Sequence, residues 1–427
     1  MKTHDIQLKL REFIKRSKQN KNVRQAAVFS FFSFLNNGIK YLLLIIVAGA
    51  ISPAGYGSLN LFTICVTLFG YLICLNTNGI IPVTFFRESQ TEVRRNINAV
   101  FSLSLTCFIA LSAAVCLWGD TIEKATSISK TFQWIALWVC FFQVFTTVNL
   151  DIWRLEENPI SYGVYSLGLV LLNSSLMLAL VFGWHWDWQG AVYAQLIAGG
   201  VFFLISIVFL VRRGYLTHIR PLVRNFKEAL SFGVPLIPHS VSFWLRQGLD
   251  RVFINSFHNV AVVGLFSFSL NFAGVIQMLG TAFNAANSVF IYKNLAKDPE
   301  NARKVLRKQT QWMTLFFVLL TVAVCLGASV FIPFFFPEYK GAVVFLFFQC
   351  LGAMFNCLYL LFVNYLFYYK KTKILMYITF SISVLHALLS YALTRYSVLY
   401  TVAIGAFTNF LIMAGVFLYS RRVYKVI

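Results

Sequence analysis

Long apolar runs recur along the entire chain and constrain its fold more than any other feature. A bilayer-spanning helix needs about 20 apolar residues, and hydrocarbon offers an irregular backbone no hydrogen-bond partner, so each run is expected to be a helix. Hydrophobic residues make up 59% of the 427-residue chain and charged residues only 12%, which leaves no room for a soluble catalytic domain. The sequence therefore predicts an all-α polytopic membrane protein. Twelve predicted spans lie at about 25–50, 57–85, 97–118, 131–152, 160–183, 189–211, 230–256, 262–291, 309–334, 341–369, 374–394 and 397–419.

The basic residues fall almost entirely on one side of this predicted topology. With the amino terminus inside, 29 of the 36 Lys and Arg residues lie in inner segments, three lie within spans and four lie in outer loops. The outer four are Lys124, Lys130, Lys340 and Arg395. Because Lys and Arg are enriched in cytoplasmic loops, both termini are predicted to be cytoplasmic. The same distribution explains the formal net charge of +21 without a nucleic-acid partner.

The two halves of the chain show a faint internal repeat. Pro53–Gly57, between the first two spans, resembles Val260–Gly264, between the seventh and eighth spans, at an offset of 207 residues. Six spans per half, both halves starting inside, predict a parallel repeat of two six-helix bundles around a central cavity. The predicted parts are a basic cytoplasmic arm (1–24), an N-terminal bundle (25–211), a cytoplasmic linker (212–229), a C-terminal bundle (230–419) and a cytoplasmic tail (420–427).

Lys40 lies deep inside the first predicted span, where a charge is expensive. A central Lys or Arg costs roughly 2.5–3.5 kcal/mol on insertion scales, and such residues usually line a cavity or pathway. Asn36 and Asn37, one turn earlier, give the same region a polar face. Lys40 is therefore predicted to act in a cavity, the alternative being a buried structural hydrogen-bond donor.

The seventh predicted span carries Arg246, Asp250 and Arg251. Asp250 follows Arg246 at the i, i+4 spacing, so the two are expected to pair. Arg246 is too deep to reach the surface, whereas Arg251 lies nearer to it. Together with Lys40, three cations face one carboxylate, which suits an anionic passenger with phosphate oxygens. The alternative is a buried ion-pair network that holds spans one and seven together.

The remaining features point to no enzyme, metal or cofactor. The eight cysteines lie inside apolar runs without metal-ligand spacing, and no catalytic constellation is present. Pro235 and Pro238 begin the seventh span and predict either a hinge or a static kink. His239 and His386 are expected to form hydrogen bonds inside the bundle, with ion coupling as the alternative.

Several stretches resemble one family of membrane proteins. They are Ser52–Leu61, Asp151–Glu157, Ser231–His239, Gly248–Arg251, Val263–Ser267 and Ala285–Leu295. With twelve spans and cations on spans one and seven, the chain resembles the Wzx-type polysaccharide flippases of the multidrug/oligosaccharidyl-lipid/polysaccharide exporter (MOP) superfamily. The resemblance implies a bacterial inner-membrane transporter, not an enzyme. It would move an undecaprenyl-pyrophosphate-linked oligosaccharide to the periplasmic leaflet by alternating access, for O-antigen, lipopolysaccharide or capsule assembly.

The resemblance also implies roles for particular residues of this chain. Lys40, Arg246 and Arg251 would hold the pyrophosphate, and Asp250 would orient Arg246 or take part in coupling. Polysaccharide polymerase and chain-length proteins would be partners, and no cofactor is implied. The alternatives are a drug/cation antiporter of the same superfamily and a membrane polymerase or ligase acting on lipid-linked glycan. Candidates for polar cavity residues are Asn36, Asn37, Asn271 and Gln277.

Overall fold

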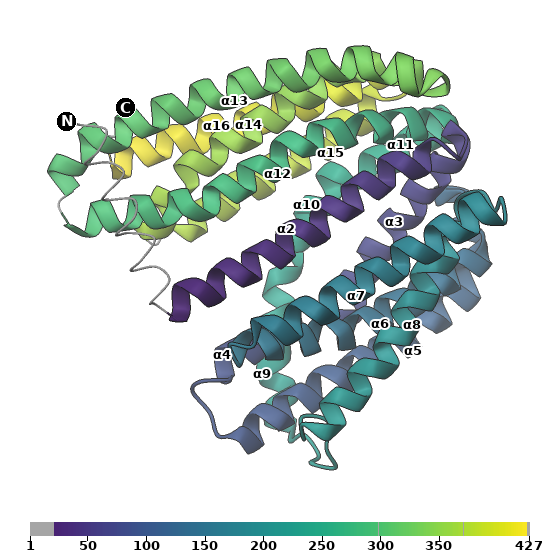
Figure 1. Ribbon diagram of the computed structural model, residues 1–427, viewed down its shortest axis with the longest axis vertical. Helices are drawn as coiled ribbons and strands as arrows, with labels where there is room; N and C mark the ends of the chain where they lie inside the picture. Colours follow the sequence, from purple (N-terminus) through teal and green to yellow (C-terminus); the bar gives the residue numbers. More distant parts are fainter. Residues whose placement is uncertain (1–20, 298, 370, 425–427) are drawn as a thin grey trace. The chain divides into compact units, whose positions relative to one another are not determined.

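The computed structural model describes residues 21–424 except 298 and 370, and this part of the chain contains helices and no strand (Figure 1). Residues 1–20 of the predicted arm and 425–427 of the predicted tail lie outside the described residues. The long helices are α2 (Lys21–Ala48), α3 (Pro53–Cys74), α5 (Gln90–Thr126), α6 (Lys130–Leu155), α7 (Pro159–Leu178), α8 (Trp188–Arg212), α12 (Val260–Lys297), α13 (Pro299–Phe335), α14 (Val343–Tyr368), α15 (Thr372–Leu393) and α16 (Val398–Val423).

Eleven helices of the described residues are long and apolar enough to cross a membrane. They correspond to the predicted spans one to six and eight to twelve, so the prediction of an all-α polytopic membrane protein is confirmed. Four short elements lie between these long helices: η1 (Thr77–Gly79), α4 (Ile80–Thr84), the π-helical η2 (Ala179–Gly183) and the 3₁₀ segment η4 (Pro337–Ala342).

The seventh span, predicted as one continuous helix over 230–256, is instead broken into pieces. They are α9 (Val223–Gly233), η3 (Val234–Leu236), α10 (Ile237–Gln247) and α11 (Leu249–Phe257). Pro235 has no N–H, and its ring clashes with the carbonyl one turn earlier, which explains the first break. Gly248, between α10 and α11, weakens the helix at the second.

The outer loop predicted at Gly119–Lys130 is also mostly helical, because α5 continues to Thr126. The turn that follows is held by the buried side chain of Gln133. Its Nε2 donates to the carbonyl oxygens of Gly119 and Ile128, both at 2.9 Å.

The contacts divide the chain into two compact units. Unit 1 contains the residues through Val47, Phe69–Cys116 and Trp134–Val234, and unit 2 contains Ala48–Leu68, Leu117–Gln133 and the residues from Pro235 onward. In unit 1, α7 packs against α8. The hydroxyl of Tyr165 on α7 donates to the carbonyl oxygen of Phe202 on α8 at 2.8 Å.

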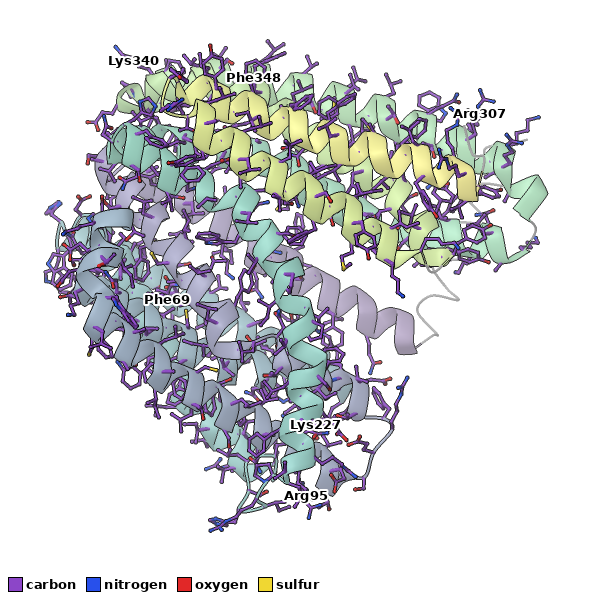
Figure 2. All side chains as sticks on the ribbon, turned by 180° about the vertical axis from the view of Figure 1, so that it is seen from behind. Phe69, Arg95, Lys227, Arg307, Lys340 and Phe348 are labelled. Atoms are coloured by element: carbon purple, nitrogen blue, oxygen red, sulfur yellow. The ribbon has the colours of Figure 1, made fainter. Side chains whose placement is uncertain are left out.

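The centre of unit 2 is α14, which packs against α12, α13 and α16 (Figure 1). Its buried residues run almost the length of the helix and include Cys350 and Cys357. Figure 2 shows Lys340 and Arg307 at opposite ends of this unit. Arg307 belongs to the basic segment predicted to be cytoplasmic and Lys340 to a predicted outer loop.

The repeat seen in the sequence becomes a reciprocal backbone contact in unit 2. A Cβ added to Gly57 at the start of α3 would lie 1.9 Å from the carbonyl oxygen of Val260 at the start of α12. A Cβ added to Gly264 would lie 1.8 Å from the carbonyl oxygen of Pro53. Each glycine therefore lets the other helix approach, and the four residues occupy equivalent positions of the repeat.

The helix starts are capped in the same equivalent way. The side chain of Ser52 accepts a hydrogen bond from the backbone N–H of Gly55 at 3.1 Å. The side chain of Asn259 accepts one from the N–H of Val262 at 3.0 Å. Both residues satisfy a free N–H of the first turn, so the caps as well as the glycines keep the offset of 207.

We predict that Gly57→Ala and Gly264→Ala each destabilise the protein by about 1–3 kcal/mol, the usual cost of overpacking. The added methyl group meets backbone atoms, which cannot rotate away. Thermal unfolding of the purified protein measures the effect. Gly405→Ala on α16 is the matched control, since its Cβ would meet nothing within 4 Å. Equal melting temperatures for all three variants would contradict the packing account.

Candidate functional site

The broken helix α10–α11 is tied to its neighbours by four polar side chains. The donors and acceptors lie on α3, α12, α15 and α16, all within unit 2. The bonds are Trp244 Nε1 to Ile64 O (3.3 Å), Arg246 Nη1 to Asn409 Oδ1 (3.4 Å), Asp250 to His386 and Arg251 Nε to Ser267 Oγ (3.0 Å). Every charged residue of the predicted seventh span therefore has a defined neighbour.

Asp250 pairs with His386 on α15, not with Arg246. His386 Nε2 lies 3.1 and 3.2 Å from the two carboxylate oxygens, and Ser390 Oγ donates to Oδ1 at 2.7 Å. The predicted pairing of Asp250 with Arg246 is therefore wrong. Its i, i+4 spacing assumed a continuous helix, but the helix is interrupted at Gly248 between them.

His386 continues this network on its other ring nitrogen. Nδ1 lies 2.9 Å from Thr408 Oγ1 on α16, and that hydroxyl donates to the carbonyl oxygen of Ile404 at 2.8 Å. Asp250, His386, Ser390 and Thr408 are 4%, 1%, 0% and 1% exposed. The expectation that His386 forms hydrogen bonds inside the bundle is confirmed, and the side chain of His239 lies outside the described residues.

Arg246 is half-buried at the end of α10 and is only partly satisfied. Its single direct hydrogen bond to a described residue is the long one to Asn409, and its guanidinium lies over the ring of Phe243, 5.3 Å from the centroid. The buried Nε has no hydrogen-bond partner among the described residues. A guanidinium held at one nitrogen with another N–H free is suited to receive an anion.

Arg251 is more fully engaged than Arg246. Besides Ser267, its Nη1 donates to the carbonyl oxygen of Gln247 at 2.6 Å. These bonds join α11 to α12 and bridge the break at Gly248. The side chain thus has a structural function that Arg246 lacks.

Lys40 lies on a polar stripe of α2 in unit 1. Ser33, Asn37 and Lys40 are all exposed, and their i, i+4, i+7 spacing places them on one face. On the opposite face, Leu42 and Ile46 are 64% and 49% exposed. The helix therefore separates a polar surface from an apolar surface suited to lipid.

The predicted polar cavity residues are placed differently from one another. Asn36 is buried, and its Nδ2 donates to Ser166 Oγ on α7 at 2.9 Å, whereas Asn37 is exposed beside Lys40. In unit 2, Asn271 Nδ2 donates to the hydroxyl of Tyr56. Gln277 is half-buried on α12.

Pro235 and Pro238 are exposed at the junction of η3 and α10. The chain passes from unit 1 to unit 2 between Val234 and Pro235. The helix break and this boundary therefore coincide.

The linker before that junction is anchored to unit 1. Glu92 on α5 accepts from Arg224 at 3.0 Å and from Asn225 at 3.3 Å, both on α9. Figure 2 shows Arg95 and Lys227 at this end of the unit. Earlier in the linker, Tyr215 donates to Glu156 at 2.6 Å. Burial raises the pKa of Tyr215, which keeps the phenol protonated and donating.

No group of three or more His, Cys, Asp or Glu side chains among the described residues could hold a metal ion. The polar residues that the sequence prediction missed are Ser390, Thr408 and Asn409. The i, i+4 spacing of His386 and Ser390 places both on one face of α15 and was a usable signal. Nothing in the sequence indicates which helix that face meets.

Comparison with known proteins agrees with this fold. Residues 23–290 match the family model described as polysaccharide biosynthesis protein, and residues 235–392 match the MatE model. A Haemophilus influenzae protein of the Lsg locus is 24% identical over 346 residues, 79% of this chain and 82% of that protein. The lipid II flippase MurJ, in an inward closed conformation, superposes with a TM-score of 0.72 at 13% identity over 92% of this chain and 87% of its own. An inward-facing multidrug resistance MATE transporter superposes with a TM-score of 0.71 at 15% identity, over 90% of this chain and 94% of its own.

The fold is that of the membrane transporters of the MOP superfamily. Because the family model spans more than half of the residues, the chain belongs to the polysaccharide biosynthesis protein family. The resemblance to the polysaccharide flippases of the MOP superfamily that was drawn from the sequence is thereby confirmed.

We predict that Asn37→Cys and Lys40→Cys react with a charged, water-soluble thiol reagent at least about tenfold faster than Leu42→Cys, because a thiolate forms readily only where water solvates it. The three variants are made in a background lacking the eight native cysteines, and labelling of membranes is followed over time. Equal rates at Lys40→Cys and Leu42→Cys would show that the polar stripe is not a wet surface.

Proposed function

We propose that this protein is a flippase that moves a lipid-linked oligosaccharide from the cytoplasmic to the periplasmic leaflet. The proposed substrate is an undecaprenyl-pyrophosphate-linked repeat unit for O-antigen or capsular polysaccharide, and the proposed location is the bacterial inner membrane with both termini in the cytoplasm. Membership in the polysaccharide biosynthesis protein family supports a glycan as part of the transported substrate. The likeness in fold to a lipid II flippase supports a lipid carrier to which that glycan is attached.

The observation that carries the proposal is the incompletely bonded guanidinium of Arg246. A half-buried cation whose Nε–H has no described partner is costly and is relieved when an anionic oxygen binds. Arginine presents its donors as a planar fork that matches phosphate oxygens. Phe243 on one side and Asn409 on another hold that fork in place.

A pyrophosphate-sugar headgroup needs such a site to cross the membrane. Transfer of an unpaired charge into hydrocarbon costs many kcal/mol, so the protein must replace the water and counter-ions that the headgroup leaves behind. We assign Lys40 to the same task, because it lies on the exposed polar stripe of α2. Asn37 on that stripe would contact sugar hydroxyls.

Other predicted residues receive narrower roles in the proposal. Arg251 stabilises the break at Gly248 and contributes positive potential, since its donors already bind Ser267 and Gln247. Pro235 and Pro238 form the hinge for alternating access, because the helix break and the boundary between the units meet there. The two six-helix halves, 25–211 and 230–419, form the repeat that alternates, and a polymerase and a chain-length protein would receive the product.

The rival drug/cation antiporter would require a carboxylate available to a cationic substrate. Asp250 is fully engaged by His386 and Ser390. Asp151 on α6 forms an ion pair with Arg154 at 3.2 Å. Among the described charged residues of α10 and α11, Arg246 is the one with a buried polar atom that lacks a hydrogen-bond partner, which favours an anionic passenger.

We predict that Arg246→Ala lowers the glycan displayed on the cell surface at least about tenfold, since a hydrogen bond to a charged group contributes about 1.5–3 kcal/mol. Arg246→Lys should restore display only in part, because it keeps the charge but loses the fork. Surface glycan and the amount of protein in the membrane are measured together.

The matched control for this experiment is Arg395→Ala, which removes an exposed arginine whose described partner is its neighbour Tyr396. Cells that carry Arg395→Ala should display the normal amount of glycan on their surface. Full display by cells that carry Arg246→Ala at normal protein levels would rule out the assignment of Arg246 to the substrate.

A further inference from the structure

A basic hollow lies on the exposed side of α13 in unit 2, and the proposed substrate site does not use it. The hollow has a volume of about 500 Å³ and is lined by Lys304, Arg307, Lys308, Gln311, Trp312 and Leu315. All six side chains are exposed, and their spacing of three and four residues places them on one side of the helix. Figure 2 shows Arg307 at this end of the unit. The volume lies within the range of small-molecule sites, about 300–1,000 Å³.

The positive charge of the hollow is not neutralised within its own helix. Lys304, Arg307 and Lys308 have no ion-pair partner among the described residues. The sequence from 301 to 337 contains no Asp or Glu. No carboxylate therefore lies within one turn of Arg307 or Lys308 on α13, the distance at which helical neighbours pair.

The acidic residues elsewhere in this part of the chain are few. Between Pro235 and Ile427 they are Asp250, Asp298, Glu300 and Glu338. Asp250 is bonded to His386, and Glu338 belongs to η4 with Lys340, at the end of the unit opposite Arg307 (Figure 2). The backbone of Glu300 is seven residues before Arg307, about 10 Å along the helix axis. The surplus of positive charge in the hollow therefore suits an anion from outside the chain.

Beyond the hollow, the same side of α13 becomes an apolar stripe. Its residues follow one another at steps of three and four and are all exposed: Leu315, Leu319, Val322 and Leu326. Residues 313–335 include no charged residue. Trp312, which is 62% exposed, lies at the junction of the hollow and the stripe. Tryptophan between charged and apolar surfaces is typical of the membrane–water interface, so the stripe is a lipid-facing surface that begins directly beside the hollow.

The lengths of these parts match the layers of a bilayer. About 20 residues separate Leu315 from Phe335, where α13 ends, and they span about 30 Å, the thickness of the hydrocarbon core. From Leu315 back to Lys308 the helix rises about 10 Å. Because the headgroup layer extends about 5–7 Å beyond the hydrocarbon, the long side chains of Arg307 and Lys308 can reach the phosphate groups of the adjacent lipids.

We propose that the hollow on α13 is a binding site for the headgroup of an anionic glycerophospholipid of the surrounding membrane. The lipid phosphate accepts hydrogen bonds from the planar fork of Arg307 and from the ammonium groups of Lys304 and Lys308. Trp312 lies at the level of the ester groups, and the acyl chains follow the apolar stripe. The lipid is part of the membrane and is not transported, so this site does not depend on the proposed function.

A membrane lipid fits this surface better than a water-soluble anion does. Free phosphate would contact the cations but would leave Trp312 and the apolar stripe without a role, whereas one lipid molecule uses all three. A zwitterionic headgroup carries an ammonium group that the same cations repel. The site is therefore expected to select lipids by the net negative charge of the headgroup.

The test measures the preference of this site for phosphatidylglycerol over phosphatidylcholine. Leu319→Cys, one turn beyond the hollow, is labelled with a fluorophore in the full-length protein without the eight native cysteines. The protein is placed in phosphatidylcholine nanodiscs with increasing fractions of either lipid carrying a nitroxide on its acyl chain. We expect half-maximal quenching at a mole fraction at least about fivefold lower for phosphatidylglycerol.

The variant Arg307→Gln with Lys308→Gln should lose this preference, because each basic residue near an anionic membrane surface contributes about fivefold in binding. The matched control is Arg212→Gln with Lys227→Gln in unit 1, which also removes one exposed arginine and one exposed lysine. The control should keep the preference. Thermal unfolding of both double variants confirms that they are folded.

Three results would overturn the lipid site. They are equal quenching by the two lipids in the wild type, a preference that survives Arg307→Gln with Lys308→Gln, and an equal loss in the control, which would assign the preference to overall charge. Displacement of the labelled phosphatidylglycerol by millimolar glycerol phosphate would assign the hollow to a soluble phosphate and reject the lipid. Because the experiment involves no transport, failure of the flippase proposal leaves its result unchanged.

Discussion

The cost of holding charge among apolar helices organises the α10–α11 segment. An unpaired buried charge costs several kcal/mol, so each charged residue there must find a partner, water or a ligand. Asp250 and Arg251 find partners on α15 and α12, and they hold the segment where its backbone is interrupted. Among the described residues, the one direct hydrogen bond of Arg246 is the long one to Asn409. Its incompletely bonded positive charge is the feature on which the proposed chemistry depends.

A second constraint acts on the backbone. Gly57 and Gly264 allow the starts of α3 and α12 to meet at backbone distance, so residues from both halves of the sequence build one compact unit. The equivalent caps at Ser52 and Asn259 fix where each helix begins. The repeat is therefore preserved where the two copies contact each other, which explains why its sequence trace is confined to a few residues.

The sequence predicted the spans well and their polar contacts poorly, for a physical reason. Hydropathy depends on local composition, so eleven spans were found where the helices lie. The break at Gly248 and the partner of Asp250 depend on which face α15 presents, and that is a tertiary property. The same limit appears on α2: Asn36 and Asn37 looked equivalent beside Lys40, but Asn36 faces Ser166 while Asn37 shares the exposed stripe.

The sidedness of the lipid-linked oligosaccharide in cells that lack this protein tests the central claim most directly. A flippase account predicts that complete repeat units accumulate on the cytoplasmic leaflet, protected from reagents that cannot cross the membrane. Complete units that face the periplasm but remain unpolymerised or unattached would contradict it. The step would then come after translocation, as for a polymerase or a ligase.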